Sequence, residues 1–353
     1  MTSEQSRIHV PKAGTRAAFL DRGVARFLDS HQDLKLGRTE WYDVERQKHA
    51  EVFALKNLPE HKANPIGTVE FTTVRGPHGD IPIRVLYPEK GIDLRTSGDA
   101  GALVYCHGGE YCVGSVDEFE NGLRLIAETS GCLVVAVEYR LAPEFRYPVQ
   151  LDEYSAVVDW VQGDGGRYRG VHPRRVAGGG DGVGGSMTVA LCFRRRSLGL
   201  KPLAAQLLLY PAVYSSYLNL EEDEGEPTYY MQGKGTYSCT IHYLPLTADL
   251  PRPVEYVYPG DQGSSGLIGQ PPAAILTNGF DPLREDGIRF ARKMNRVGLL
   301  AAWKHYDDLA YGWLQMTPWS EAARQATCDA GVELRRLLYK PDIEEELVRQ
   351  HNL

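Results

Sequence analysis

The sequence predicts an α/β fold: a mostly parallel eight-stranded sheet, flanked by helices and covered by a helical cap. Short, continuously apolar segments alternate with helical patterns between residues 102 and 210, and the alternation resumes after residue 273. Apolar strands that alternate with helices are typical of a parallel sheet covered on both faces. The chain has 353 residues, a length that favours one large domain with an inserted cap.

The chain divides into four consecutive parts. Residues 1–66 are polar, with short amphipathic runs at 17–28 and 41–58, and have too few apolar residues for a core of their own. We interpret them as an N-terminal cap segment. Residues 67–211 are predicted to be the first part of the core, residues 212–272 a cap or lid insertion, and residues 273–353 the second part of the core. The insertion is predicted because structureless loops of this length are rare in compact domains.

Within the core, residues 68–74 and 81–88 alternate in polarity, and a glycine-rich turn joins them into an antiparallel hairpin. The polar segment 89–100 is interpreted as a loop. The predicted parallel strands are 102–106, 132–138, 175–178, 204–210, 273–277 and 301–306. The predicted core helices are 118–129, 148–161, 185–198, 284–297 and 320–338.

Composition and charge exclude several classes of function. A net charge of −7 and a pI near 5.8 provide no basic face for nucleic acid or an anionic membrane. No apolar run approaches the roughly 20 residues that span a bilayer. The six cysteines are scattered, which favours free thiols over a disulfide framework. Because residues 1–14 carry no secretory signal pattern, we expect a reduced, cytoplasmic protein.

No cofactor is predicted. The glycine run at residues 178–185 lacks the lysine and threonine of a phosphate-binding loop. Cys239 and His242 have a ligand-like spacing, but no second pair of metal ligands accompanies them. We therefore predict a protein that uses neither a metal ion nor an organic cofactor.

The pattern Gly180-Asp181-Gly182-Val183-Gly184 lies between a predicted strand and a predicted helix. It matches the G-x-S-x-G nucleophile elbow, in which a strained turn lifts a serine above the carboxyl ends of the sheet. The nucleophile position holds Gly182, which has no side chain to be acylated.

The order of motifs along residues 67–340 resembles the hormone-sensitive-lipase-like branch of the α/β-hydrolases, the fold-3 family that includes many carboxylesterases. The matching motifs are His107-Gly108-Gly109-Glu110 for the H-G-G-G oxyanion loop, Tyr139-Arg140-Leu141-Ala142-Pro143-Glu144 for Y-R-L-A-P-E, the elbow itself, Asp281-Pro282-Leu283-Arg284-Glu285 for the D-P-L-R-D acid motif, and Tyr311-Gly312-Trp313 for H-G-F or H-G-W. The resemblance implies an α/β-hydrolase fold.

The same resemblance implies a degenerate catalytic triad. Gly182 replaces the serine, Tyr311 replaces the histidine, and Glu110 replaces the third glycine of the oxyanion motif, while the triad acid remains as Asp281. Loss of one triad member typically costs a serine hydrolase roughly 10⁴ to 10⁶ in turnover. Loss of two leaves no ordinary acyl-enzyme route.

The candidate site follows from these matches. Tyr311, Asp281 and Glu110 are the candidate catalytic residues for proton transfer, and which carboxylate acts as a base stays open. The predicted oxyanion hole, formed by Gly108, Gly109, Glu110 and Val183, provides backbone N–H donors that do not depend on side chains. The predicted substrate pocket consists of His107, Tyr111, Asp181, Gly182 and Trp313.

The leading functional hypothesis is a non-hydrolytic enzyme of small-molecule, polyketide-type secondary metabolism. It would promote cyclisation, isomerisation, elimination or C–C bond chemistry on a hydrophobic carbonyl substrate. One alternative is a catalytically inactive ligand-binding or receptor-like protein, and another is a residual esterase that uses an activated water. The resemblance also makes a homodimer an expectation.

Overall fold

The computed structural model describes residues 15–37, 42–215, 230–231, 241–245 and 251–351. One sheet has the order β1-β2-β4-β3-β5-β6-β7-β8; β1 and β2 are antiparallel to their neighbours, and the other adjacent strands pair in parallel. The strands are β1 (Thr68–Gly76), β2 (Gly79–Tyr87), β3 (Ala100–Cys106), β4 (Leu133–Val137), β5 (Val171–Asp181), β6 (Ala205–Leu209), β7 (Ala273–Phe280) and β8 (Leu300–Ala310). The predicted mostly parallel eight-stranded sheet is confirmed.

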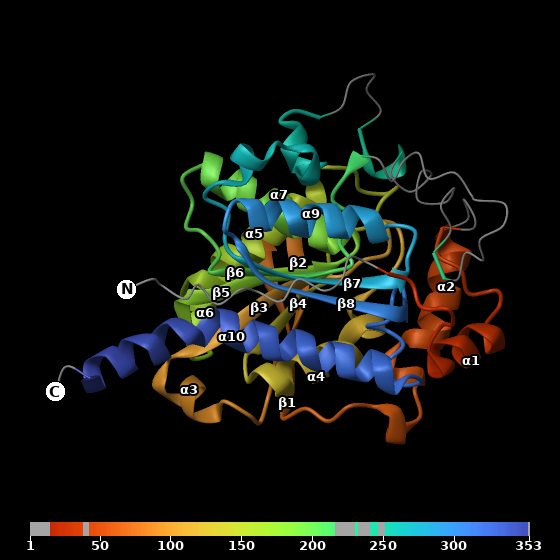
Figure 1. The fold of residues 1–353 in the computed structure, drawn as a ribbon, viewed down its shortest axis with the longest axis horizontal. Coiled ribbons are helices and arrows are strands. Elements are labelled where there is room, and N and C mark those ends of the chain that lie inside the picture. Colours follow the sequence, from red (N-terminus) through yellow and green to blue (C-terminus); the bar gives the residue numbers. More distant parts are fainter. Residues whose placement is uncertain (1–14, 38–41, 216–229, 232–240, 246–250, 352–353) are drawn as a thin grey trace.

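Helices cover both faces of this sheet, as Figure 1 shows, with α4 and α10 on one face and α5, α7 and α9 on the other. The described helices are α1 (Arg22–Ser30), α2 (Tyr42–Phe53), α3 (Ile92–Ser97), α4 (Val116–Ser130), α5 (Val149–Gln162), α6 (Asp164–Arg167), α7 (Val183–Ser197), α9 (Arg284–Arg296) and α10 (Glu321–His351). Every residue of β3, β4, β6 and β7 is buried. The main core therefore lies in the two layers between the sheet and these helices.

Three elements differ from the sequence-based predictions. Residues 89–100 contain the short helix α3, which glycines in the left-handed conformation flank on both sides, Gly91 and Gly98. Strand β5 begins at Val171, where it pairs with Ala100 before an irregularity in the register. Strand β8 continues to Ala310, and several of its polar residues are only half buried because it is the edge strand of the sheet. Its second half lacks an apolar run, so the sequence predicted only residues 301–306.

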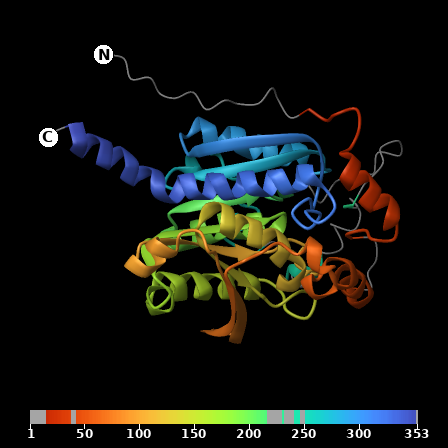
Figure 2. The same ribbon diagram turned by 90° about the horizontal axis from the view of Figure 1, so that it is seen from below.

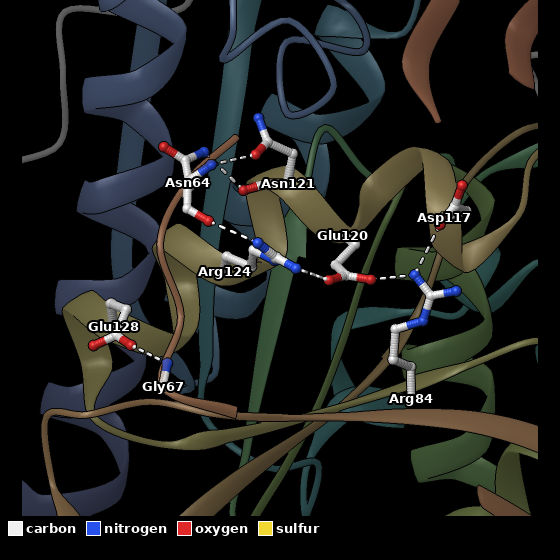
Figure 3. A network of polar contacts seen from close by, with 8 residues as sticks. All are labelled: Asn64, Gly67, Arg84, Asp117, Glu120, Asn121, Arg124 and Glu128. Atoms are coloured by element: carbon white, nitrogen blue, oxygen red, sulfur yellow. Dashed lines mark hydrogen bonds and ion pairs between the residues drawn. The ribbon is translucent and has the colours of Figure 1, made fainter. Parts of the chain in front are cut away.

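The N-terminal helices α1 and α2 lie at one end of the molecule, next to the first turns of α4 and α10 (Figure 2). The chain then crosses α4, where it is held by polar contacts. Asn64 donates its backbone N–H to Asn121 (2.7 Å) and its side-chain amide to the Asn121 carbonyl (2.9 Å), and Arg124 donates to the Asn64 carbonyl (2.9 Å). Glu120 joins Arg124 to Arg84 of β2 in the same network (Figure 3). The network fixes α4 between the sheet and the N-terminal segment.

The N-terminal segment also contacts the region predicted as a cap insertion. Leu36 donates its backbone N–H to the carbonyl of Tyr230 (2.9 Å) and forms an isolated parallel bridge with Met231. Much of residues 212–272 lies outside the described residues, so the four-part division of the chain stays a prediction.

Five of the six cysteines lie in the described part of the chain, and none of these five forms a disulfide bond. Among the described helices, none is long and apolar enough to cross a bilayer.

Candidate active site

The turn between β5 and α7 places Gly182 at the carboxyl edge of the sheet. Its backbone angles are φ 49° and ψ −118°, in the left-handed region that strains residues with a side chain. Gly182 donates its N–H to Leu209 (3.0 Å), and its carbonyl accepts from Ala212 (3.0 Å). These bonds hold the elbow in its sharp conformation although the residue at its tip has no side chain.

The hydroxyl of Tyr311 fills the space above Gly182. A Cβ atom built on Gly182 would come closer than 3.0 Å to this oxygen, a distance that real Cβ atoms essentially never show. Tyr311 follows the last residue of β8, and its N–H donates to the carbonyl of Phe280 at the end of β7 (3.1 Å). The phenol is buried, and burial raises the pKa of Tyr311 well above its ordinary value. It is therefore a protonated donor at neutral pH.

The carboxyl group of Glu110 is the partner of this phenol. The Tyr311 hydroxyl donates to Glu110 Oε1 at 3.4 Å, and within the described part of the chain it makes no hydrogen bond to Asp281. Glu110 is fully buried, and its Oε2 has no hydrogen-bond partner among the described residues. Burial raises the pKa of Glu110 to about 8, with smaller contributions from the charges of Asp181 and Asp281.

The oxyanion loop follows β3 and is anchored to the elbow through Asp181. One carboxylate oxygen of Asp181 accepts from the Tyr105 hydroxyl (2.7 Å) and from the backbone N–H of Gly108 (2.8 Å). Glu110 and Tyr111 then adopt left-handed backbone angles, with φ of 52° and 64°. This unusual pair of conformations turns the loop sharply after Gly109 and brings Glu110 to Tyr311.

The described residues offer no backbone carbonyl partner to the N–H groups of Gly109, Glu110 and Val183. Val183 is the first residue of α7, where helix N–H groups have no intrahelical acceptor. Three donors at the predicted oxyanion positions are thus available for a ligand.

Asp281, the predicted triad acid, lies near these groups and is partly buried. Its Oδ1 accepts the N–H of Leu283 (2.7 Å), and burial raises its pKa to about 7. Asp281 is near enough for its charge to raise the pKa values of Glu110 and Tyr311. Asp281 therefore contributes to the electrostatic field of the site, and Glu110 accepts the hydrogen bond of the Tyr311 hydroxyl.

The predicted pocket residues have different surroundings. His107 is buried with its ring stacked on Tyr139 (4.4 Å between centroids), and its Nδ1 lies 2.7 Å from the carbonyl of Gly108. The ring of Tyr111 stacks on Tyr243 (3.6 Å between centroids), and Trp313 is fully buried with its edge against Tyr210. These three residues pack around the site and support its walls.

A small cavity lies next to the elbow, lined among others by Gly109, Asp181 and Tyr311. About 10 Å³ of it is open to the centre of a water molecule, which is room for about one water. His49 of α2 and Glu118 of α4 also line this cavity, and the sequence analysis missed both. His49 lies in a polar segment without any motif, and Glu118 is one of several acidic residues on its helix, so no pattern distinguished them. Among the described residues, no cluster of three or more side chains could hold a metal ion.

The sequence comparisons agree with this architecture. A family model described as alpha/beta hydrolase fold matches residues 103–315. Esterase LipI of Mycobacterium tuberculosis is 31% identical over 287 residues, which cover 81% of this chain and 87% of that protein. Carboxylesterase NlhH of the same organism is 31% identical over 273 residues, covering 74% of this chain and 79% of its own length.

Solved structures of similar proteins have the same fold. The hyperthermophilic esterase from Pyrobaculum calidifontis superposes with a TM-score of 0.77 at 25% identity, covering 90% of this chain and 99% of that structure. The structure of DphMB1 superposes with a TM-score of 0.75 at 28% identity, covering 91% of this chain and 100% of that structure.

Proposed function

Because the chain belongs to the alpha/beta hydrolase fold family, in its hormone-sensitive-lipase-like branch, we propose that it hydrolyses carboxylic esters. The relatives named esterase and carboxylesterase align with 81% and 74% of the chain. This coverage supports an enzyme of the same type. The observation that carries the proposal is the position of the Tyr311–Glu110 pair over an elbow that keeps the sharp backbone turn of a hydrolase.

The predicted non-hydrolytic function is wrong. The two relatives from Mycobacterium tuberculosis and the Pyrobaculum calidifontis structure are named as esterases, and no cyclase, isomerase or lyase is among those reported above. The assignment to secondary metabolism depended on the same hypothesis and is withdrawn with it. Of the two alternatives, hydrolysis by an activated water agrees better with these relatives than a catalytically inactive receptor does.

In the proposed mechanism, the Glu110 carboxylate is the general base. A water molecule attacks the ester carbonyl carbon and gives one proton to Glu110, while the carbonyl oxygen becomes an oxyanion. The N–H groups of Gly109, Glu110 and Val183 stabilise this oxyanion by hydrogen bonds. The ester C–O bond then breaks, and the leaving alkoxide takes the proton from Glu110, so that a carboxylic acid and an alcohol are released.

The phenol of Tyr311 holds the base in place. Its hydrogen bond to Oε1 orients the carboxyl group and leaves Oε2 for the water. The raised pKa of Glu110, about 8, makes it a stronger base than an exposed glutamate once it is ionised. Burial thus improves the base while lowering the fraction of it that is ionised at neutral pH.

Hydrolysis of p-nitrophenyl acetate and p-nitrophenyl butyrate tests the proposal. We expect slow turnover by the unmodified protein, and Glu110→Gln is expected to lower kcat by about 10² to 10⁴, the usual contribution of a general base. The amide keeps an acceptor for Tyr311 but cannot take a proton. Glu128→Gln is the matched control and should leave kcat unchanged. Glu128 lies on α4, and its carboxylate accepts a hydrogen bond from the Gly67 N–H. Equal turnover of the Glu110→Gln and Glu128→Gln proteins would contradict the mechanism.

A further inference from the structure

His49 presents an unpaired ring nitrogen in the interior of the protein. Its Nδ1 lies 2.8 Å from the backbone carbonyl of Glu45, one turn earlier in α2. A carbonyl oxygen only accepts hydrogen bonds, so Nδ1 carries the proton and Nε2 has a free lone pair. The side chain is 1% exposed, and Nε2 has no partner among the described residues. Burial lowers the pKa of His49 to about 4, which keeps the ring neutral.

Glu118 presents the complementary group. Its Oε1 accepts from the hydroxyl of Ser115 (2.9 Å), while Oε2 is buried and has no partner in the described structure. The residue is 4% exposed, and burial raises its pKa to about 8, with Glu138 and Asp117 adding to the rise. At neutral pH the carboxyl group is therefore mostly protonated, and Oε2 is free to donate.

The two residues line the same water-sized cavity as Tyr311 and Asp181. They come from different elements, α2 of the N-terminal segment and α4 of the core. A buried donor or acceptor without a partner is destabilising, and two of them beside one cavity next to the elbow indicate a ligand that satisfies both.

We propose that His49 and Glu118 form a subsite that binds a hydroxyl group of the ester substrate. A hydroxyl matches the subsite because it donates to the imidazole lone pair and accepts from the carboxyl proton with a single heavy atom. The space excludes larger polar groups, and an ionic group would be costly in so buried a place. This inference rests on the proposed ester hydrolysis and specifies its substrate class as hydroxylated esters.

Two esters that differ by one hydroxyl test the subsite: p-nitrophenyl 3-hydroxybutyrate and p-nitrophenyl butyrate. We expect kcat/KM of the unmodified protein to favour the hydroxylated ester by about tenfold or more, because sites built around a substrate hydroxyl reject analogues that lack it. His49→Phe and Glu118→Leu should bring the ratio close to one, mainly through KM. Glu118→Gln keeps a donor and should keep the preference.

His31 provides a matched control for the histidine. Its Nδ1 makes the same contact, 2.8 Å to the carbonyl of Phe27 one turn earlier in α1, but it does not line this cavity. His31→Phe should therefore leave the substrate ratio unchanged. A ratio near one in the unmodified protein, or a ratio that survives His49→Phe in a protein with unchanged circular dichroism, overturns the subsite.

A binding measurement separates the subsite from the catalytic proposal. Thermal unfolding is followed with ethyl 3-hydroxybutyrate and with ethyl butyrate, neither of which needs to be hydrolysed for a shift in Tm. A shift with the hydroxylated ester alone, lost in His49→Phe, supports the subsite even when no ester is turned over and the proposed hydrolysis fails. Equal shifts with both esters, or none with either, overturn the subsite even when hydrolysis is observed.

Discussion

At Gly182, an added side chain would overlap the hydroxyl of Tyr311, so the residues at these two positions depend on each other. We predict that Gly182→Ser alone lowers the free energy of unfolding by about 1–3 kcal/mol, the usual cost of overpacking a buried position, and adds no esterase activity. Denaturant unfolding and the p-nitrophenyl butyrate assay measure the two effects. A single variant as stable as the parent protein would contradict the overlap.

The double variant Gly182→Ser with Tyr311→His should behave differently. The imidazole is shorter than the phenol, and serine, histidine and Asp281 would then occupy the three triad positions. We expect turnover at least about 10²-fold above the parent protein, since a nucleophile and its base act as one unit. Gly182→Ser with Tyr311→Phe removes the hydroxyl without supplying a base, and its turnover should not exceed that of the parent protein. Equal rates in the two double variants would show that the triad geometry is not retained.

The pH dependence of hydrolysis follows from the state of Glu110. The base must be ionised, and its pKa is raised to about 8, so kcat/KM should rise with pH through about 8 and then level off. The hydrogen bond from Tyr311 lowers this pKa, so Tyr311→Phe should move the midpoint to higher pH. Initial rates between pH 6 and 9.5, corrected for spontaneous hydrolysis, measure both. A flat profile would remove Glu110 as the base.

At the scale of one residue, the sequence motifs predicted which side chains meet but not how they are oriented. Gly182, Tyr311, Glu110 and Asp281 do lie together, because each follows a strand end at the same edge of the sheet. That the phenol donates to Glu110 depends on two consecutive left-handed residues in the oxyanion loop. His49 was not predictable, because no motif connects a helix of the N-terminal segment with the elbow.

Among the elements, α2 is fastened to the oxyanion loop by one side chain. Arg46 donates to the carbonyls of Cys112 (2.6 Å) and Ala142 (2.7 Å) and forms an ion pair with Glu144 (2.7 Å). We predict that Arg46→Met lowers the free energy of unfolding by about 2–4 kcal/mol, since charged hydrogen bonds contribute roughly 1.5–3 kcal/mol each and are not additive. It should also raise KM for the hydroxylated ester, because α2 carries His49 to the cavity.

The control for this variant is Arg75→Met. Arg75 pairs with Asp80 on the exposed hairpin, where its side chain is 81% exposed, and such surface pairs contribute about 0–1 kcal/mol. Urea unfolding of the two variants gives the comparison. A loss of stability as small for Arg46→Met as for Arg75→Met would mean that α2 is held by other contacts.

The sequence predicted the fully buried strands best, because a short, continuously apolar run between turns is typical of a strand covered on both faces. Edge strand β8 and the start of β5 contain polar residues, so their lengths depend on pairing with neighbours, which a local pattern does not show. Helix α3 is six residues long, too short for a periodic signal.

For the whole molecule, we predict that the free energy of unfolding falls as the pH rises from about 4.5 to about 8, because of the buried carboxyl groups. Burial raises the pKa values of Glu110 and Glu118 to about 8, and those of Asp181 and Asp281 to about 7. The folded state therefore keeps protons that the unfolded state has already released, and each such group makes unfolding easier with rising pH, by up to about 1.4 kcal/mol per pH unit. This effect ends above the folded pKa.

Buried histidines act in the opposite direction, over a range that ends at about pH 6.5. His49 and His107 have pKa values lowered to about 4, so their contribution to stability rises between about pH 4 and 6.5 and is constant above that range. Urea unfolding between about pH 6.5 and 8 therefore isolates the carboxyl groups. Glu118→Gln should flatten the slope, whereas an unchanged slope would mean that Glu118 is not protonated in the folded protein.

The glycine at the elbow also has a consequence for evolution and engineering. A serine with φ near 50° carries a conformational strain of roughly 1–2 kcal/mol, which serine hydrolases bear for the sake of their nucleophile. Gly182 removes that strain, so a typical trade-off between activity and stability is relaxed at this point of the fold. The released stability is comparable to the destabilisation from one unpaired buried polar group. A chain with a relaxed elbow therefore tolerates buried acidic residues around its active site more easily than the same chain with a serine at the elbow would.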